Sequence, residues 1–97
     1  MSDIVNKDQW VYVIVQDPGK NESFLGQQDT EKDISFIPTF LSNEDAGACL
    51  THLKKDGSKK YEIQAILYED LLKNASQNGF MVFILNASGE ILKRETI

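Results

Sequence analysis

Two residues stand at a spacing that would suit nucleophilic or metal chemistry. Cys49 and His52 are three positions apart, and residues three apart are neighbours on a helix surface. Together they would form a nucleophile–base pair or half of a metal site. Cys49 falls within an apolar helical stripe, however, and a buried thiol without a cationic neighbour is inert. The chain has no second cysteine or histidine, so we favour a core cysteine and a surface histidine.

An alternating acidic segment is a second candidate. Asp29, Glu31 and Asp33 would offer oxygen ligands to a hard cation. Counted from Asp29, the sixth position is Ile34, where a calcium loop needs glycine, and the twelfth is Phe40, where it needs glutamate. We therefore interpret this segment as an exposed acidic hairpin loop.

The basic segment Lys54–Lys60 contains four of the ten lysine and arginine residues and would suit a phosphate. It also follows a predicted helix, and cations at a helix C-terminus are stabilised by roughly 0.3–1 kcal/mol each. Its single glycine does not form a phosphate-cradling loop. We favour the helix-end interpretation and leave anion binding open.

Two acidic pairs, Glu44 with Asp45 and Glu69 with Asp70, stand at predicted helix starts. Paired carboxylates can act as acid and base when burial raises one pKa. A helix N-terminus favours the ionised form instead, which explains both pairs without a reaction. Ser42 is expected to be an N-cap. The residues thus predict no enzyme: no catalytic, cofactor or metal site.

The elements that must carry these residues follow from hydrophobic periodicity and turn signals. Strands are expected over 10–16, 24–28, 34–41, 61–67, 80–86 and 90–95, and helices over 42–55 and 68–78, with Gly79 ending the second helix. This order, β-β-β-α-β-α-β-β, indicates a single α+β domain over 1–97, with 1–9 expected to be flexible. Because α+β folds segregate their helices, we expect both helices on one face of a mixed five- to six-stranded sheet.

Pro38 interrupts the third predicted strand. Proline has no N–H to donate to a strand ladder. We therefore expect Pro38 on an edge strand or at a bulge, without a ladder partner on one side.

The segment Ile37-Pro-Thr-Phe-Leu-Ser-Asn-Glu-Asp45 resembles a strand-to-helix corner of the SseB N-terminal-like domain family, and 62–85 resembles the strand–helix–strand unit that follows there. The family's Asn-Pro-Gly turn is Asn86-Ala-Ser-Gly89 here, without the proline. The resemblance covers residues 24–89. It implies a small bacterial α+β domain and carries over no catalytic residues.

Composition excludes several classes of protein. A formal charge of −5 argues against a nucleic-acid ligand, because such binders gain affinity by neutralising phosphates. The longest apolar run, Phe80–Leu85, is far shorter than a membrane span. A single cysteine and the lack of a signal sequence at the N-terminus predict a cytoplasmic location.

Apolar strand surface motivates the leading functional hypothesis, a non-enzymatic interaction module. One face of 10–16 carries Trp10, Tyr12 and Ile14 and the other carries three valines, so both faces need cover. With both helices on one face, the other would be partly covered by the N-terminal segment or by another molecule. We predict a homodimer, or a contact with another protein, through Trp10, Tyr12 and Ile14. The alternative hypothesis is a small-ligand or substrate-binding domain with a pocket near the helix N-termini.

Overall fold

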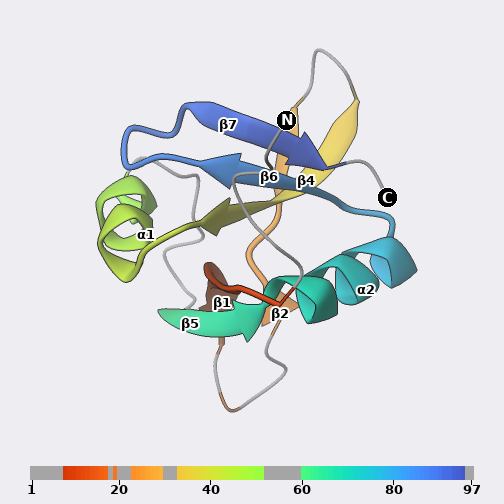
Figure 1. The fold of residues 1–97 in the computed structure, drawn as a ribbon, viewed down its shortest axis with the longest axis horizontal. Coiled ribbons are helices and arrows are strands. Elements are labelled where there is room, and N and C mark those ends of the chain that lie inside the picture. The colour runs from red at the N-terminus through yellow and green to blue at the C-terminus, as the bar shows by residue number, and fades with distance from the viewer. Residues whose placement is uncertain (1–7, 18, 20–22, 30–32, 52–59, 96–97) are drawn as a thin grey trace.

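A computed structural model describes residues 8–17, 19, 23–29, 33–51 and 60–95 of the chain. The described elements are, in chain order, β1 (Trp10–Gln16), β2 (Ser23–Phe24), β3 (Gln27–Asp29), β4 (Ile34–Phe40), α1 (Asn43–Leu50), β5 (Tyr61–Leu67), α2 (Tyr68–Asn78), β6 (Met81–Leu85) and β7 (Ile91–Glu95). The strands form one mixed sheet (Figure 1). The predicted α+β class is confirmed.

The second predicted strand is divided into the short strands β2 and β3 by Leu25 and Gly26. The Leu25 N–H donates to the Ile14 carbonyl at 2.7 Å. A Cβ added at Gly26 would lie only 2.9 Å from Cε1 of Phe80. A glycine is therefore needed for the backbone to approach this ring so closely. Because the predicted strand is divided in two, the described sheet has seven strands rather than the expected five or six.

Local capping sets the helix ends. The Asp45 N–H donates to the Ser42 side chain at 3.1 Å, which confirms the predicted N-cap of α1. Gly79 closes α2 in the left-handed conformation, with φ of 75°, as predicted. The helix α1 ends at Leu50 with Thr51 as its C-cap, and residues 52–55 of the predicted helix lie outside the described residues. Neither described helix has the length and apolar character needed to span a membrane.

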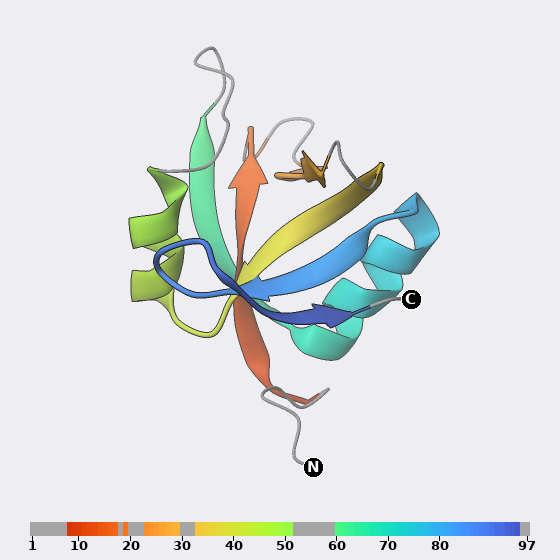
Figure 2. The same cartoon turned by 90° about the horizontal axis from the view of Figure 1, so that it is seen from above.

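Two strands of the sheet diverge and leave a wedge between them. The strand β1 pairs with β5 along its whole length, but with β4 only at Tyr12 and Val13. Beyond that point β4 turns away from β1 (Figure 2). The strand β2 pairs with the end of β1, and β3 pairs with the start of β4. The β2–β3 segment thus fills the wedge, while β6 and β7 extend the sheet beyond β4.

Pro38 lies at this wedge. The strand β4 is in the interior of the sheet, so the expectation of an edge strand is wrong. Pro38 pairs with Phe83 of β6, but neither β1 nor β3 supplies a partner on its other side. The carbonyl of Ile14, the next residue of β1, accepts the Leu25 N–H instead. The predicted absence of a ladder partner on one side is confirmed.

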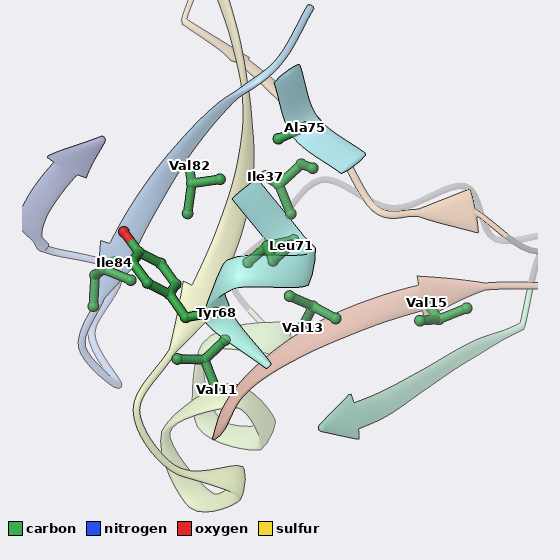
Figure 3. Close-up of a cluster of buried hydrophobic side chains, with 9 residues drawn as sticks. All are labelled: Val11, Val13, Val15, Ile37, Tyr68, Leu71, Ala75, Val82 and Ile84. Atoms are coloured by element: carbon green, nitrogen blue, oxygen red, sulfur yellow. The ribbon is translucent and has the colours of Figure 1, made fainter. Parts of the chain in front are cut away.

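The two helices lie on opposite faces of the sheet (Figures 1 and 2), so the expectation that both pack on one face is wrong. The helix α2 covers one buried cluster (Figure 3), made of Val11, Val13, Val15, Ile37, Tyr68, Leu71, Ala75, Val82 and Ile84. The helix α1 covers the other, made of Ile14, Leu25, Phe40, Ala46, Cys49, Phe83 and Leu85. Each face of the sheet therefore has its own core.

The alternation of strand side chains explains this arrangement. In β1 the buried valines face α2, while Tyr12 and Ile14 face α1. Both sets are apolar, so a cover on one face alone would leave the other in water. One helix on each face covers both sets. Each large apolar side chain that is fully buried in this way adds roughly 1.5–3 kcal/mol to the stability of the fold.

Candidate ligand-binding groove

A groove of about 860 Å³ opens on the α2 face of the sheet. It lies beside the last two turns of α2, where β1 and β4 diverge. Small-molecule sites occupy roughly 300–1,000 Å³. The lining residues come from β1 to β5, from α2 and from the residue before β6: Val13, Val15, Gln16, Ser23, Phe24, Gly26, Gln27, Gln28, Ser35, Ile37, Gln64, Ala65, Ile66, Asn74, Asn78 and Phe80.

Apolar residues form the base of the groove. Val13, Val15 and Ile37 are buried within the α2-side core, which fixes their positions. Phe24 and Phe80 are partly buried and pack against the same core. The apolar surface open to a ligand therefore comes from partly buried residues such as Phe24 and Phe80, because Val13, Val15 and Ile37 are almost inaccessible.

Strand pairing brings polar residues onto the same face. Gln64 is opposite Val13 in the β1–β5 pair, and Gln28 is opposite Ser35 in the β3–β4 pair. Opposed side chains of an antiparallel pair lie on one face. Ser35 also stands two residues before Ile37, hence on its face. The three polar residues therefore border the apolar base where α2 no longer covers it.

Internal hydrogen bonds fix part of the polar lining. Three carboxamides donate to neighbours: Gln16 Nε2 to Ser23 Oγ at 2.9 Å, Gln27 Nε2 to the Gly26 carbonyl at 3.1 Å, and Asn78 Nδ2 to the Asn74 carbonyl at 2.8 Å. By contrast, the side chains of Gln28, Ser35 and Gln64 have no hydrogen bond with any other described residue. These three keep their capacity to donate to, and accept from, a ligand.

The groove has no charged lining residue among those described, although charged residues make up 26% of the chain. General acid–base catalysis needs a titratable group, and nucleophilic catalysis needs an activated one. The described lining offers amides, hydroxyls and apolar surface. This described lining suits binding through apolar contact and hydrogen bonds.

Cys49 lies in the α1-side core, on the sheet face opposite the groove. It is fully buried, at 0% exposure, and this burial raises the pKa of its thiol. The interpretation as a core cysteine is confirmed. His52 lies outside the described residues, so the structure does not place the pair.

The charged candidates are only partly described. Glu31 lies outside the described residues, as does Lys54–Lys60 apart from Lys60, and Asp33 is exposed. Within the described ranges, no three histidine, cysteine, aspartate or glutamate residues are grouped so as to hold a metal ion. The acidic pairs occupy the first turns of α1 and α2, as expected. Glu69 forms an exposed pair with Lys73 at 3.5 Å.

The three residues predicted as an interface differ in their accessibility. Trp10 is 57% exposed, whereas Ile14 is 1% exposed. Tyr12 is half-buried and packs against the α1-side core. The helix-free face on which this interface depended does not exist, because α1 covers it. Of the three, Trp10 alone presents a largely accessible side chain.

The groove was not identified from the sequence: the predicted pocket was placed near the helix N-termini, whereas the groove lies at the C-terminal end of α2. One signal was present: Gln64 and Ser35 interrupt apolar strands at positions that share a face with Ile66 and Ile37. That signal marks a polar position but does not show which strands lie together.

Comparisons with protein-family models, with curated proteins and with solved structures found no match to this chain. The resemblance to the SseB N-terminal-like domain therefore stays a prediction.

Proposed function

We propose that this chain is a non-enzymatic binding domain that holds a small ligand in the groove beside α2. The observation that carries the proposal is the composition of the described lining: partly buried apolar side chains, Phe24 and Phe80 among them, beside uncharged hydrogen-bonding side chains. Small-molecule sites have this composition, because apolar contact supplies affinity and a few polar groups fix orientation.

The setting proposed for this activity is the bacterial cytoplasm. One cysteine in 97 residues suits a reducing compartment. The resemblance to the SseB N-terminal-like domain supports a bacterial source.

A fragment screen with a blocked variant tests the proposal. At about 0.3 kcal/mol per heavy atom, a fragment of about 14 atoms binds with a Kd of about 1 mM. We expect saturation-transfer NMR to find such binders for the native protein. Ser35→Trp, which fills the groove from β4, should weaken them at least about tenfold.

Lys73→Trp is the matched control, because Lys73 is exposed on α2 and does not line the groove. It should leave binding unchanged. Gln28→Trp, at an exposed position, is a second blocking variant if Ser35→Trp misfolds. Binders that tolerate both blocking variants, or a screen without binders, would contradict the proposal.

Exposed apolar residues favour self-association as a second candidate function. Ile91 and Leu92 of β7 are 40% and 50% exposed. Within the described sheet β7 pairs only with β6, and an open strand edge can pair with a second copy. We propose a symmetric homodimer through β7, the commonest closed arrangement.

Light scattering coupled to gel filtration tests the dimer. At micromolar concentration we expect twice the monomer mass of 11.0 kDa. Leu92→Lys should give a monomer by placing like charges across the two-fold contact, while Gln77→Lys on the exposed side of α2 should not. A native protein that elutes as a monomer contradicts this candidate.

A further inference from the structure

We infer that the groove selects an uncharged ligand that joins an apolar body to an amide or hydroxyl group. This inference rests on the proposed function and specifies its ligand class. Three features of the described lining support it: its lack of charged residues, its unused hydrogen-bonding capacity and its apolar side chains.

The described part of the lining, which carries no charge, opposes ionised ligands. A carboxylate, phosphate or ammonium group that enters a groove loses hydration, and only a counter-charge or several hydrogen bonds offset that loss. None of the described lining residues supplies a counter-charge. The net charge of −5 further opposes anions. A cation is therefore the main alternative to an uncharged ligand, and the test includes a cationic compound.

The unused polar groups specify the hydrogen-bonding part of the ligand. A carboxamide offers two donors and one acceptor oxygen, and a hydroxyl both donates and accepts. Gln64, Gln28 and Ser35 keep these groups free of other described residues. A ligand amide or hydroxyl can satisfy both kinds of group at once, whereas a carboxylate only accepts and an ammonium only donates.

The base of the groove specifies the apolar part. Gln64 is directly opposite Val13 in the β1–β5 pair, and Ser35 precedes Ile37 by two residues on β4. Val13 and Ile37 are themselves 0% and 2% exposed, so the apolar part of a bound ligand would contact the partly buried side chains beside them. Phe24 and Phe80 also line the groove, and their rings would favour a flat apolar body.

Three matched compounds test the inference: phenylacetamide, phenylacetate and 2-phenylethylamine share a benzyl body. At pH 7 the first is neutral, the second an anion and the third a cation. We expect NMR titration to show that the amide binds at least about tenfold more tightly than either ion.

A charge placed in the groove should change this preference. Gln64→Glu adds a carboxylate with almost no change of shape and should shift the ratio of amine to amide affinity at least about tenfold toward the amine. Gln77→Glu adds the same charge on the exposed side of α2, outside the groove, and should not. Gln28→Glu repeats the test at an exposed lining position if Gln64→Glu fails to fold.

The outcomes separate the inference from the proposed function. If all three compounds bind equally and Ser35→Trp still blocks them, or if the glutamate variants leave the preference unchanged, the neutral-ligand inference is overturned and the binding function stands. If none of the three binds while other fragments of the screen do, the inference alone is overturned. If the screen finds no binders, or if binding ignores the blocking variants, the proposed function fails and the inference fails with it.

Discussion

Replacing Ile14 by lysine is expected to unfold the domain. Ile14 is 1% exposed and packs in the α1-side core with Phe40, Cys49 and Phe83. An unpaired charge buried there costs several kcal/mol, and the lost apolar burial adds roughly 1.5–3 kcal/mol. The total free energy of unfolding of a small domain is only about 5–15 kcal/mol. We expect a loss of at least about 4 kcal/mol in urea denaturation followed by circular dichroism, or no folded protein.

Trp10→Lys is the matched control for this change. Trp10 lies on the same face of the same strand, four residues earlier, but is 57% exposed. We expect it to cost less than about 1 kcal/mol, since exposed positions tolerate substitution. A stable, folded Ile14→Lys protein would mean that α1 does not cover this face, and that the helix-free face expected from the sequence exists.

The second large expected effect is the slow reaction of the Cys49 thiol in the folded protein. Cys49 is the only cysteine, so labelling reports on this site alone. Its side chain is inaccessible, and burial raises its pKa, which lowers the fraction of reactive thiolate. Reaction with a disulfide reagent then requires opening of the α1-side core. We expect labelling at least about 100-fold slower in the native protein than in denaturant, which corresponds to an opening free energy of about 3 kcal/mol.

The raised pKa of the Cys49 thiol also predicts the direction in which stability changes with pH. The unfolded chain loses its thiol proton at a lower pH than the folded chain, so stability falls as the pH rises above the ordinary thiol pKa of about 8.5. Cys49→Ala should remove this loss, at the expense of a small cavity. Rapid native labelling with a thiol pKa below 8 would instead support a reactive cysteine.

Local patterns in the sequence were sufficient for the elements and several of their ends. The strands β1 and β5 have the predicted bounds, because runs of apolar and β-branched residues between turn signals define strands. The N-cap at Ser42 and the closing glycine at 79 were also predictable, because capping depends on residues within one helical turn.

The placement of the helices was not predictable from those patterns. An apolar stripe shows that a helix packs on something, but it does not specify which face of the sheet it covers. Both faces of β1 are apolar, and the tendency of α+β folds to segregate their helices does not account for the need to cover Ile14 and its neighbours. An interface through the face that carries Ile14 requires that face to be free of helix, and α1 covers it.

The groove depends on register, which the sequence does not specify over long range. Gln64 is near Val13 only because β5 pairs with β1, and Gln28 is near Ser35 only because β3 pairs with β4. The divergence of β1 from β4, with Pro38 beside it, leaves room for the β2–β3 segment. The pairings of β1 with β5 and with β4 are long-range, and no local pattern encodes them, whereas β3 and β4 form the hairpin that the local pattern predicted.

The most direct test of ligand binding is a map of backbone amide shifts when a neutral fragment is added to ¹⁵N-labelled protein. The binding account predicts that the largest shifts gather on β3, the start of β4, the middle of β5 and the last turns of α2, around Gln28, Ser35, Gln64 and Asn74. Shifts concentrated instead on α1 or on β7, with these residues unmoved, would contradict it.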